Sequence, residues 1–323
     1  MERGVNNWKL TIQRGETEIA ILRARTCDET AVLPETLFGL PVTVLGNHAL
    51  SPMAGDAEGE TVEIQGGPCS ADAPWDNRTM RELTFPPTLR RVGDYALFNC
   101  ASLKTLHLWD SVAYWGGGAL MNCRALDTFH LTRTGEQGES LSYFADELSR
   151  ELDVTIVETD GQTARLLFPE FVELYEENCP AHHFDYNIYG AGYPYHHCFR
   201  QKRLKYADYD NLWKGFLGME HDETCAMRLA WQRLRYPVEL SERAETAYRT
   251  YLSNHTGTAL QWLTEQRDAQ GLSFLLGRTS PSREELSTAC ETARTLRASD
   301  CLAVLLEAQH QRFPVGEDRC FDL

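Results

Sequence analysis

Cysteine and histidine residues gather at both ends of the segment CPAHHFDYNIYGAGYPYHHC, residues 179–198. Thiolates and imidazoles are ligands that zinc prefers, and a tetrahedral site needs only four of them. A metal held here would make the chain a zinc-dependent enzyme or regulator. The ligands we would assign are Cys179, His182 or His183, His196 or His197, and Cys198.

A second interpretation of this segment needs no metal. Adjacent histidines project to different sides of an extended chain, so all six cysteine and histidine side chains cannot converge on one ion. The spacing between the two clusters matches none of the common zinc patterns. Its aromatic and glycine residues are typical of a surface loop between domains: Tyr186, Tyr189, Gly190, Gly192, Tyr193 and Tyr195. We therefore expect a structural loop, with no metal and no cofactor, and keep zinc as the alternative.

Motifs of known catalytic chemistry do not occur in the sequence. There is no GxSxG, HExxH, P-loop or GxGxxG pattern. Without such a motif we assign no catalytic residue and expect that the protein is not an enzyme.

The net charge and hydropathy of the sequence indicate which classes of partner to exclude. The net charge is −16, and both halves are acidic, with −10 over residues 1–158 and −6 over 159–323. An acidic surface repels phosphate backbones, so we expect no nucleic-acid partner. No run of about 18 apolar residues occurs, which predicts no membrane insertion. The N-terminus carries no secretory signal as it stands, so we expect a cytoplasmic protein, or a cell-surface or secreted one if a signal precedes it in the natural protein.

A repeat of 23 residues shows which elements must form. VGDYALFNC, residues 92–100, returns as WGGGALMNC, residues 115–123, and VTVLGNHAL carries the same Gly-x-x-Ala-Leu pattern near residue 46. Farther upstream the repeat is less regular, although Asn77 lies 23 residues before Cys100, at the equivalent position of the preceding unit. Periods of 20–30 residues indicate solenoids, in which each coil buries its apolar side against its neighbours. We expect Cys100 and Cys123 to form a column along the stack.

Alternation within each unit predicts a short strand with one exposed face. In LKTLHL, Leu106 and Leu108 point inward, so their neighbours point outward. Threonine, histidine and tryptophan side chains then line up on the face of a stacked parallel sheet, and tryptophan is enriched at binding hot spots. The residues we expect to bind a partner are Glu82, Thr84, Thr105, His107, Trp109, Thr128, His130 and Thr132.

The repeated segments resemble a known family. LTFPPTLRRVGDYALFNCASLKTLHL and VAYWGGGALMNCRALDTFHL are similar to bacterial BspA-type leucine-rich repeats, and the resemblance covers about residues 30–132. Leu97 and Leu120 stand where the family usually has phenylalanine, and Trp115 where it has isoleucine. The resemblance implies a solenoid of short parallel strands that acts in adhesion or protein interaction.

The second half changes to helical periodicity. We expect a leucine-rich-repeat solenoid with caps over residues 1–158 and an all-α domain over 159–323. AQGLSFLLGR and ASDCLAVLLEA match at a separation of 30 residues, and each follows a predicted helix. Helix pairs at this spacing loosely resemble degenerate ankyrin-type repeats, here over about 256–313. Ser241 is expected to cap a helix.

Three functions fit these observations. The leading hypothesis is a non-enzymatic scaffold that binds another protein through the exposed strand face, the helical repeats, or both. The rival is the zinc-dependent enzyme or regulator centred on residues 179–198. In a third interpretation the solenoid is a spacer and the helical half alone recognises the partner.

Overall fold

The chain folds into two compact units. The computed structural model describes residues 6–67, 74–135, 138–178 and 183–314. Unit 1 is Met1–Glu220 and unit 2 is His221–Leu323. The unit boundary therefore lies about sixty residues beyond the one expected at 158/159, because further strands and short helices follow the solenoid within unit 1.

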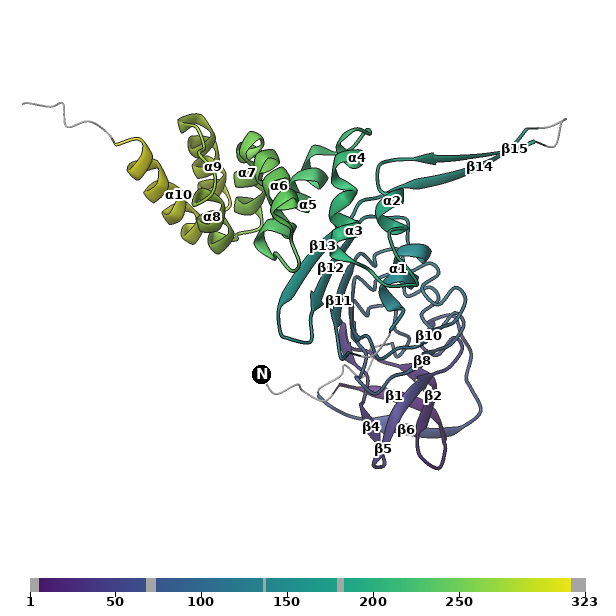
Figure 1. Ribbon diagram of the computed structural model, residues 1–323. Coiled ribbons are helices and arrows are strands. Elements are labelled where there is room, and N and C mark those ends of the chain that lie inside the picture. Colours follow the sequence, from purple (N-terminus) through teal and green to yellow (C-terminus); the bar gives the residue numbers. More distant parts are fainter. Residues whose placement is uncertain (1–5, 68–73, 136–137, 179–182, 315–323) are drawn as a thin grey trace, which may run out of the picture. The chain divides into compact units, whose positions relative to one another are not determined.

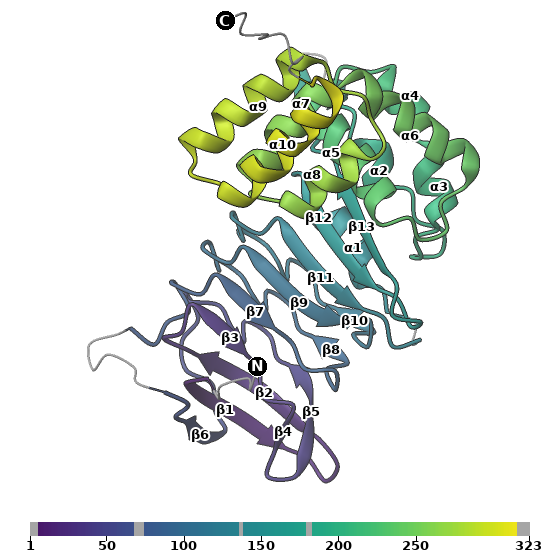
Figure 2. The same cartoon turned by 90° about the vertical axis from the view of Figure 1, so that its left-hand side faces the viewer.

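One wall of unit 1 is a six-stranded sheet. Its order is β13–β12–β11–β9–β7–β3, and the strands lie in this sequence across Figure 2. The parallel strands are β3 (Thr30–Val32), β7 (Glu82–Thr84), β9 (Thr105–Trp109), β11 (Thr128–Thr132) and β12 (Leu152–Val157), and β13 (Thr163–Phe168) pairs antiparallel with β12. Unit 1 thus contains the predicted parallel solenoid, of about five turns.

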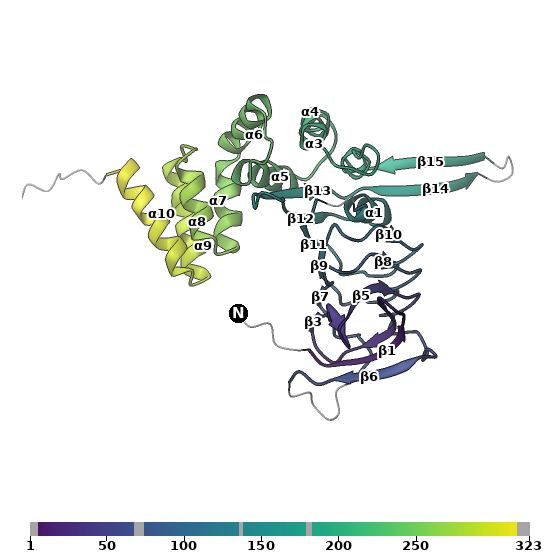
Figure 3. The same cartoon turned by 60° about the horizontal axis from the view of Figure 1, so that its bottom comes forward.

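The opposite wall belongs to a second sheet, with the order β10–β8–β5–β2–β1–β6. Its strands are β1 (Trp8–Arg14), β2 (Ile19–Arg25), β5 (Leu40–Leu45), β6 (Glu60–Ile64), β8 (Arg91–Val92) and β10 (Tyr114–Trp115), and β4 (Thr36–Leu37) pairs with β5. In Figure 3, β5, β8 and β10 stand across the coils from β7, β9 and β11. Inward side chains of both walls, such as Leu106 and Val92, are fully buried between them.

The repeated Gly-x-x-Ala-Leu motif forms the turn that leaves the second sheet. Its third residue has a positive φ in each copy: 52° at His48, 54° at Tyr95 and 60° at Gly118. Its second residue links the coils, because Asn47 Oδ1 accepts from Asp94 N and Asp94 Oδ1 accepts from Gly117 N, both at 2.9 Å. The motif recurs because each turn must hydrogen-bond to the next.

Other elements cover both ends of the solenoid. Strands β1 and β2 pair antiparallel at the first coil. At the other end, α1 (Ser140–Glu147) replaces a strand of the second sheet and packs on Trp115, whose Nε1 donates to Ser140 Oγ at 3.0 Å. The ring of Phe144 contacts Trp115 and Phe129, which closes the apolar core.

The segment after residue 158 is not all-helical, which corrects the expected all-α domain. Besides β13 it holds the two-stranded sheet β14 (Val172–Asn178) and β15 (His183–Tyr189). Three short helices follow in unit 1: α2 (Tyr193–His196), α3 (Tyr206–Asn211) and α4 (Trp213–Leu217). The predicted loop over 179–198 is therefore largely β15 and α2, and residues 179–182 lie outside the described ranges.

Unit 2 is helical over its described residues. Its helices are α5 (Glu223–Arg235), α6 (Glu242–Asn254), α7 (Thr256–Glu265), α8 (Ala269–Leu276), α9 (Arg283–Thr295) and α10 (Ser299–Arg312). Ser241 caps α6 as predicted, its hydroxyl accepting from Ala244 N. Ser282 and Glu285 form a capping box at the start of α9.

Backbone conformation and hydrogen bonding in unit 2 repeat at the same separation of 30 residues that is found in the sequence. Arg267 and Arg297 are 30 positions apart and both have a positive φ, at 56° and 53°. The next residues repeat a hydrogen bond as well, since Asp268 N donates to Leu263 O and Ala298 N donates to Ala293 O. Unit 2 therefore contains helical repeats.

Candidate functional site

The outward face of the six-stranded sheet brings the predicted binding residues into straight rows. All eight predicted residues are partly exposed and alternate with buried ones on β7, β9 and β11. One row runs Thr84, His107, His130 and Thr155, and a second runs Glu82, Thr105, Thr128 and Asp153. The in-register pairing of parallel strands produces this alignment, because each residue faces its counterpart one coil away.

Two histidines and a glutamate form the polar centre of this face. The rings of His107 and His130 stack with centroids 4.4 Å apart and planes 8° from parallel. Glu82 Oε1 lies 2.9 Å from His107 Nε2. Partial burial lowers the pKa of His130 below its ordinary value, and His107 and Arg165 lower it further, while Asp153 and Glu82 oppose them.

Charged side chains continue the face onto the last two strands. Arg165 Nη2 lies 3.3 Å from Asp153 Oδ1 and extends the face to β13. The face therefore carries both signs of charge beside threonines, a surface that fits a partner with mixed polar groups.

Trp109 stands at the edge of this face, beside a pocket of about 250 Å³. The pocket is also lined by Trp8, Phe85, Pro86 and Pro87. Trp8 is buried, and its Nε1 donates to Val32 O at 2.8 Å. Residues near the N-terminus, Asn6 and Trp8, thus complete a pocket that the repeat alone did not reveal. Neither residue lies within the repeated segments, and no other sequence pattern pointed to them.

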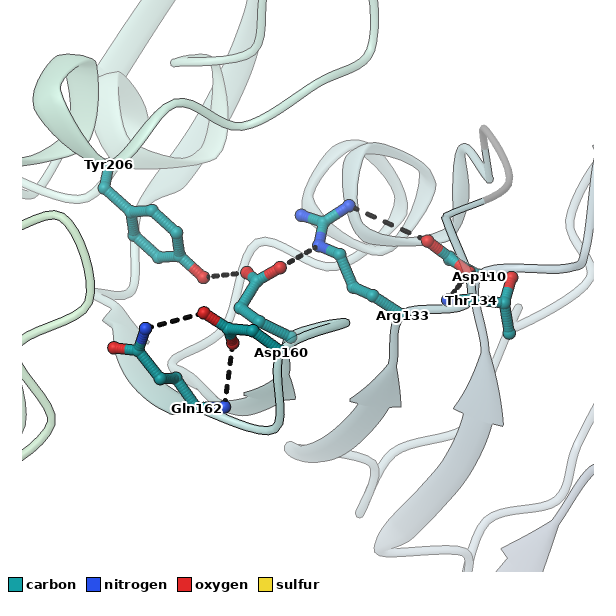
Figure 4. Close-up of polar contacts among 7 residues, drawn as sticks. Asp110, Arg133, Thr134, Asp160, Gln162 and Tyr206 are labelled. Atoms are coloured by element: carbon teal, nitrogen blue, oxygen red, sulfur yellow. Dashed lines mark hydrogen bonds and ion pairs between the residues drawn. The ribbon is translucent and has the colours of Figure 1, made fainter.

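A polar network occupies the carboxyl ends of β9, β11 and β12 (Figure 4). Asp110 is 2% exposed, and its Oδ1 accepts from the backbone N and the hydroxyl of Thr134, both at 2.7 Å. Arg133 lies between Asp110 and Glu158, with its Nε 3.3 Å from Glu158 Oε2. The Tyr206 hydroxyl donates to Glu158 Oε1 at 2.5 Å.

These contacts give the network a structural role. Asp110, Arg133 and Glu158 each directly follow a strand, so their position comes from the stacking of coils. Through Tyr206, the network fixes α3 against the end of the solenoid. Sequence reasoning missed this group because Asp110 and Tyr206 are almost a hundred residues apart.

The Cys/His segment shows no convergent ligand set among the described residues. His196 is buried, and its two ring nitrogens lie 3.0 Å from Ala145 O and 2.9 Å from Pro169 O. Cys198 Sγ donates to Tyr195 O at 3.0 Å. His196 and Cys198 thus have structural partners, and Cys179 and His182 lie outside the described ranges. Where the structure is described, no cluster of three or more histidine, cysteine or acidic residues is arranged to hold a metal.

Cysteines of the repeat form a buried column, as predicted. Cys100 Sγ donates to Leu50 O and Cys123 Sγ donates to Leu97 O. Asn77 takes the same place one coil earlier, and its Nδ2 also donates to Leu50 O. Burial raises the pKa of Cys123 to about 12, so this thiol is not a nucleophile at neutral pH. Cys27, outside the column, is disulfide-bonded.

The comparisons with known proteins give no relative. No protein-family model, curated protein or solved structure matches this chain. Within the described ranges, no helix has the length and apolar character needed to cross a membrane.

Proposed function

We propose that this protein is an interaction scaffold that holds a protein partner on the outward face of the six-stranded sheet. The observation that carries the proposal is the alignment of the eight predicted residues in rows across successive coils. The stacked His107 and His130 rings and the Trp109 pocket lie on or beside that surface.

The physical character of this face supports binding of a protein. Proteins bind through aromatic anchors accompanied by polar groups. Trp109, at the edge of the face beside its pocket, supplies an aromatic anchor, and the threonine and histidine rows supply hydrogen-bonding groups. The face is offered by a continuous sheet, so its residues are held in place before the partner arrives, which reduces the entropy lost on binding.

We further propose that the solenoid is a leucine-rich repeat of the BspA type and that unit 2 carries ankyrin-type repeats. The repeated Gly-x-x-Ala-Leu turn and the buried column support the first assignment. The backbone repeat at Arg267 and Arg297 supports the second. In this assignment unit 2 offers an additional surface for partners, while the strand face remains the principal one.

The proposal is tested with paired surface variants in a pull-down from the source cells. The face variant is Thr105→Arg with Thr128→Arg, which adds bulk outside the core. The control is Tyr114→Arg with Met121→Arg, at exposed positions outside the six-stranded sheet. We expect the control to recover the same partner proteins as the unchanged chain and the face variant to lose them.

Equal recovery by the two variants would refute a role for this face. Thermal unfolding of each variant checks that the solenoid remains folded. A second face variant, Trp109→Ser, removes the anchor without adding charge and should reduce recovery in the same direction.

A further inference from the structure

Strands β14 and β15 form an antiparallel arm that the proposed scaffold function does not use. The strands pair from Val172 with Tyr189 to Asn178 with His183, and they extend away from the solenoid in Figures 1 and 3. Over the described residues their sheet has only these two strands. Each strand therefore keeps one edge of backbone N–H and C=O groups without a strand partner there.

The base of the arm is firmly held. Phe171 is buried and its backbone N donates to Ser149 O at 2.9 Å. Its ring contacts those of Tyr193 and His196. Gly192, just after β15, allows the backbone to lie against Pro169. A Cβ at position 192 would be only 1.9 Å from Pro169 O. The arm therefore leaves unit 1 in a direction set by packing.

Apolar side chains are concentrated on the arm. Six of the thirteen exposed large hydrophobic residues among the described positions belong to it: Val172, Leu174, Tyr175, Tyr186, Ile188 and Tyr189. Tyr175 and Tyr186 are directly opposite each other, with ring centroids 4.7 Å apart. Tyr175 is 72% exposed, so the pair presents its surface to solvent. A two-stranded hairpin is marginally stable alone, and such surface gains stability when covered.

The acidic charge of the arm indicates the charge of the partner that fits it. From 172 to 189 the sequence has four acidic residues, Glu173, Glu176, Glu177 and Asp185, and neither lysine nor arginine. Glu173, Glu176 and Asp185 are exposed. A second copy of the arm would bring like charges together, in a chain whose net charge is already −16.

We propose that the arm binds an extended basic segment of a partner protein, in which lysine or arginine alternates with apolar residues. Such a segment adds as a strand to an edge of the arm and pairs with its backbone. Successive side chains of a strand point to opposite faces, so its apolar side chains cover the tyrosine pair on one face and its cations meet Glu176 and Asp185 on the other. This surface is separate from the face of the six-stranded sheet, so the two proposals stand or fall independently.

The proposal is tested by fluorescence anisotropy with the full chain. The probe is a labelled ten-residue peptide of alternating lysine and valine, and the comparison peptide alternates glutamate and valine. We expect the basic peptide to bind at least about tenfold more tightly than the acidic one. Tyr175→Ser with Tyr186→Ser should weaken the basic peptide about tenfold, because its valines lose the aromatic surface that they cover.

Charge variants separate the arm from general attraction to an acidic protein. The arm charge variant keeps both tyrosines and combines Glu173→Lys, Glu176→Lys and Asp185→Lys. It should reverse the preference, so that the acidic peptide binds more tightly than the basic one. The matched control changes three exposed acids elsewhere, Glu16→Lys, Glu58→Lys and Glu220→Lys, and should retain the original preference.

Two outcomes would overturn the proposal. One is equal weakening of the basic peptide by the arm and control charge variants, which would assign binding to net charge alone. The other is self-association of the unchanged chain in sedimentation equilibrium that Tyr175→Ser abolishes, which would assign the arm to a second copy.

Discussion

At the scale of residues, Gly116 and Gly117 are neighbours in different surroundings. A Cβ at Gly116 would lie 2.4 Å from Asp94 N and 2.5 Å from the carbonyl carbon of Gly93. A Cβ at Gly117 would meet nothing within 4 Å. The first glycine allows one coil to approach the next, and the second lies in open space.

We therefore predict opposite outcomes for alanine at these two positions. Gly116→Ala should lower the free energy of unfolding by about 2 kcal/mol or more, because the backbone of the preceding coil must move. Gly117→Ala should be neutral or stabilise by about 0.5 kcal/mol, because it restricts the unfolded chain. Urea unfolding measures both, and equal losses would contradict the close stacking of coils.

His130 allows a prediction about pH. Its pKa is lowered in the fold, first by burial and then by His107 and Arg165. The unfolded chain, with a histidine pKa of about 6.5, then binds more protons than the folded one in mildly acidic solution. The contribution of His130 to stability is thus present above about pH 6.5 and is lost as the pH falls from there through the folded pKa.

Two substitutions should move the pKa of His130 in opposite directions. His107→Gln removes a neighbour that lowers it and should raise the midpoint, whereas Glu82→Gln removes a carboxylate that raises it and should lower the midpoint. NMR titration of the His130 ring measures both shifts, with His130→Gln to assign the signal. Shifts of the same sign would contradict the arrangement of the three side chains.

At the scale of elements, strand β9 separates core from surface by simple alternation. Leu106 is fully buried, while Thr105 next to it is half-buried on the outward face. Leu106→Ala should lower the free energy of unfolding by about 2–5 kcal/mol through the cavity it leaves. Thr105→Ala, the matched control, should change it by less than about 1 kcal/mol. Urea unfolding of the two variants checks this, and comparable losses would mean that the strand faces are assigned wrongly.

The same alternation explains how much of the fold could be predicted. Leu106 and Leu108 repeat every 23 residues against a buried wall, so the strands, their register and the outward rows follow from the sequence. The stack also makes the column of Asn77, Cys100 and Cys123 predictable. Elements whose side chains meet the same neighbours in every coil leave a signal that recurs.

The sequence of the arm carries no such recurring pattern. Val172, Leu174, Tyr175 and Ile188 are exposed although they are apolar, so β14 and β15 show no alternation between a buried and an exposed face. The sequence around them therefore predicts a loop in an all-α domain, whereas the structure has two strands. Tyr206 and Trp8 were missed for a different reason, because their partners Glu158 and Val32 are brought near only by the fold.

At the scale of the whole molecule, the chain offers separate surfaces of different chemistry. The six-stranded sheet presents rows of threonine and histidine with a tryptophan at a pocket. The arm presents acidic groups around a tyrosine pair. Unit 2 adds helical repeats. In the proposed scaffold, surfaces of such different charge and apolar content would select different partners.

The most direct measurement places a photoreactive amino acid on the six-stranded sheet. A benzoylphenylalanine at Thr128, which lies in an outward row, should form covalent adducts with the partner on illumination in extracts of the source cells. The same residue at Met121, exposed outside that sheet, should form none with that partner. Adducts from Met121 but not from Thr128 would contradict binding through the strand face.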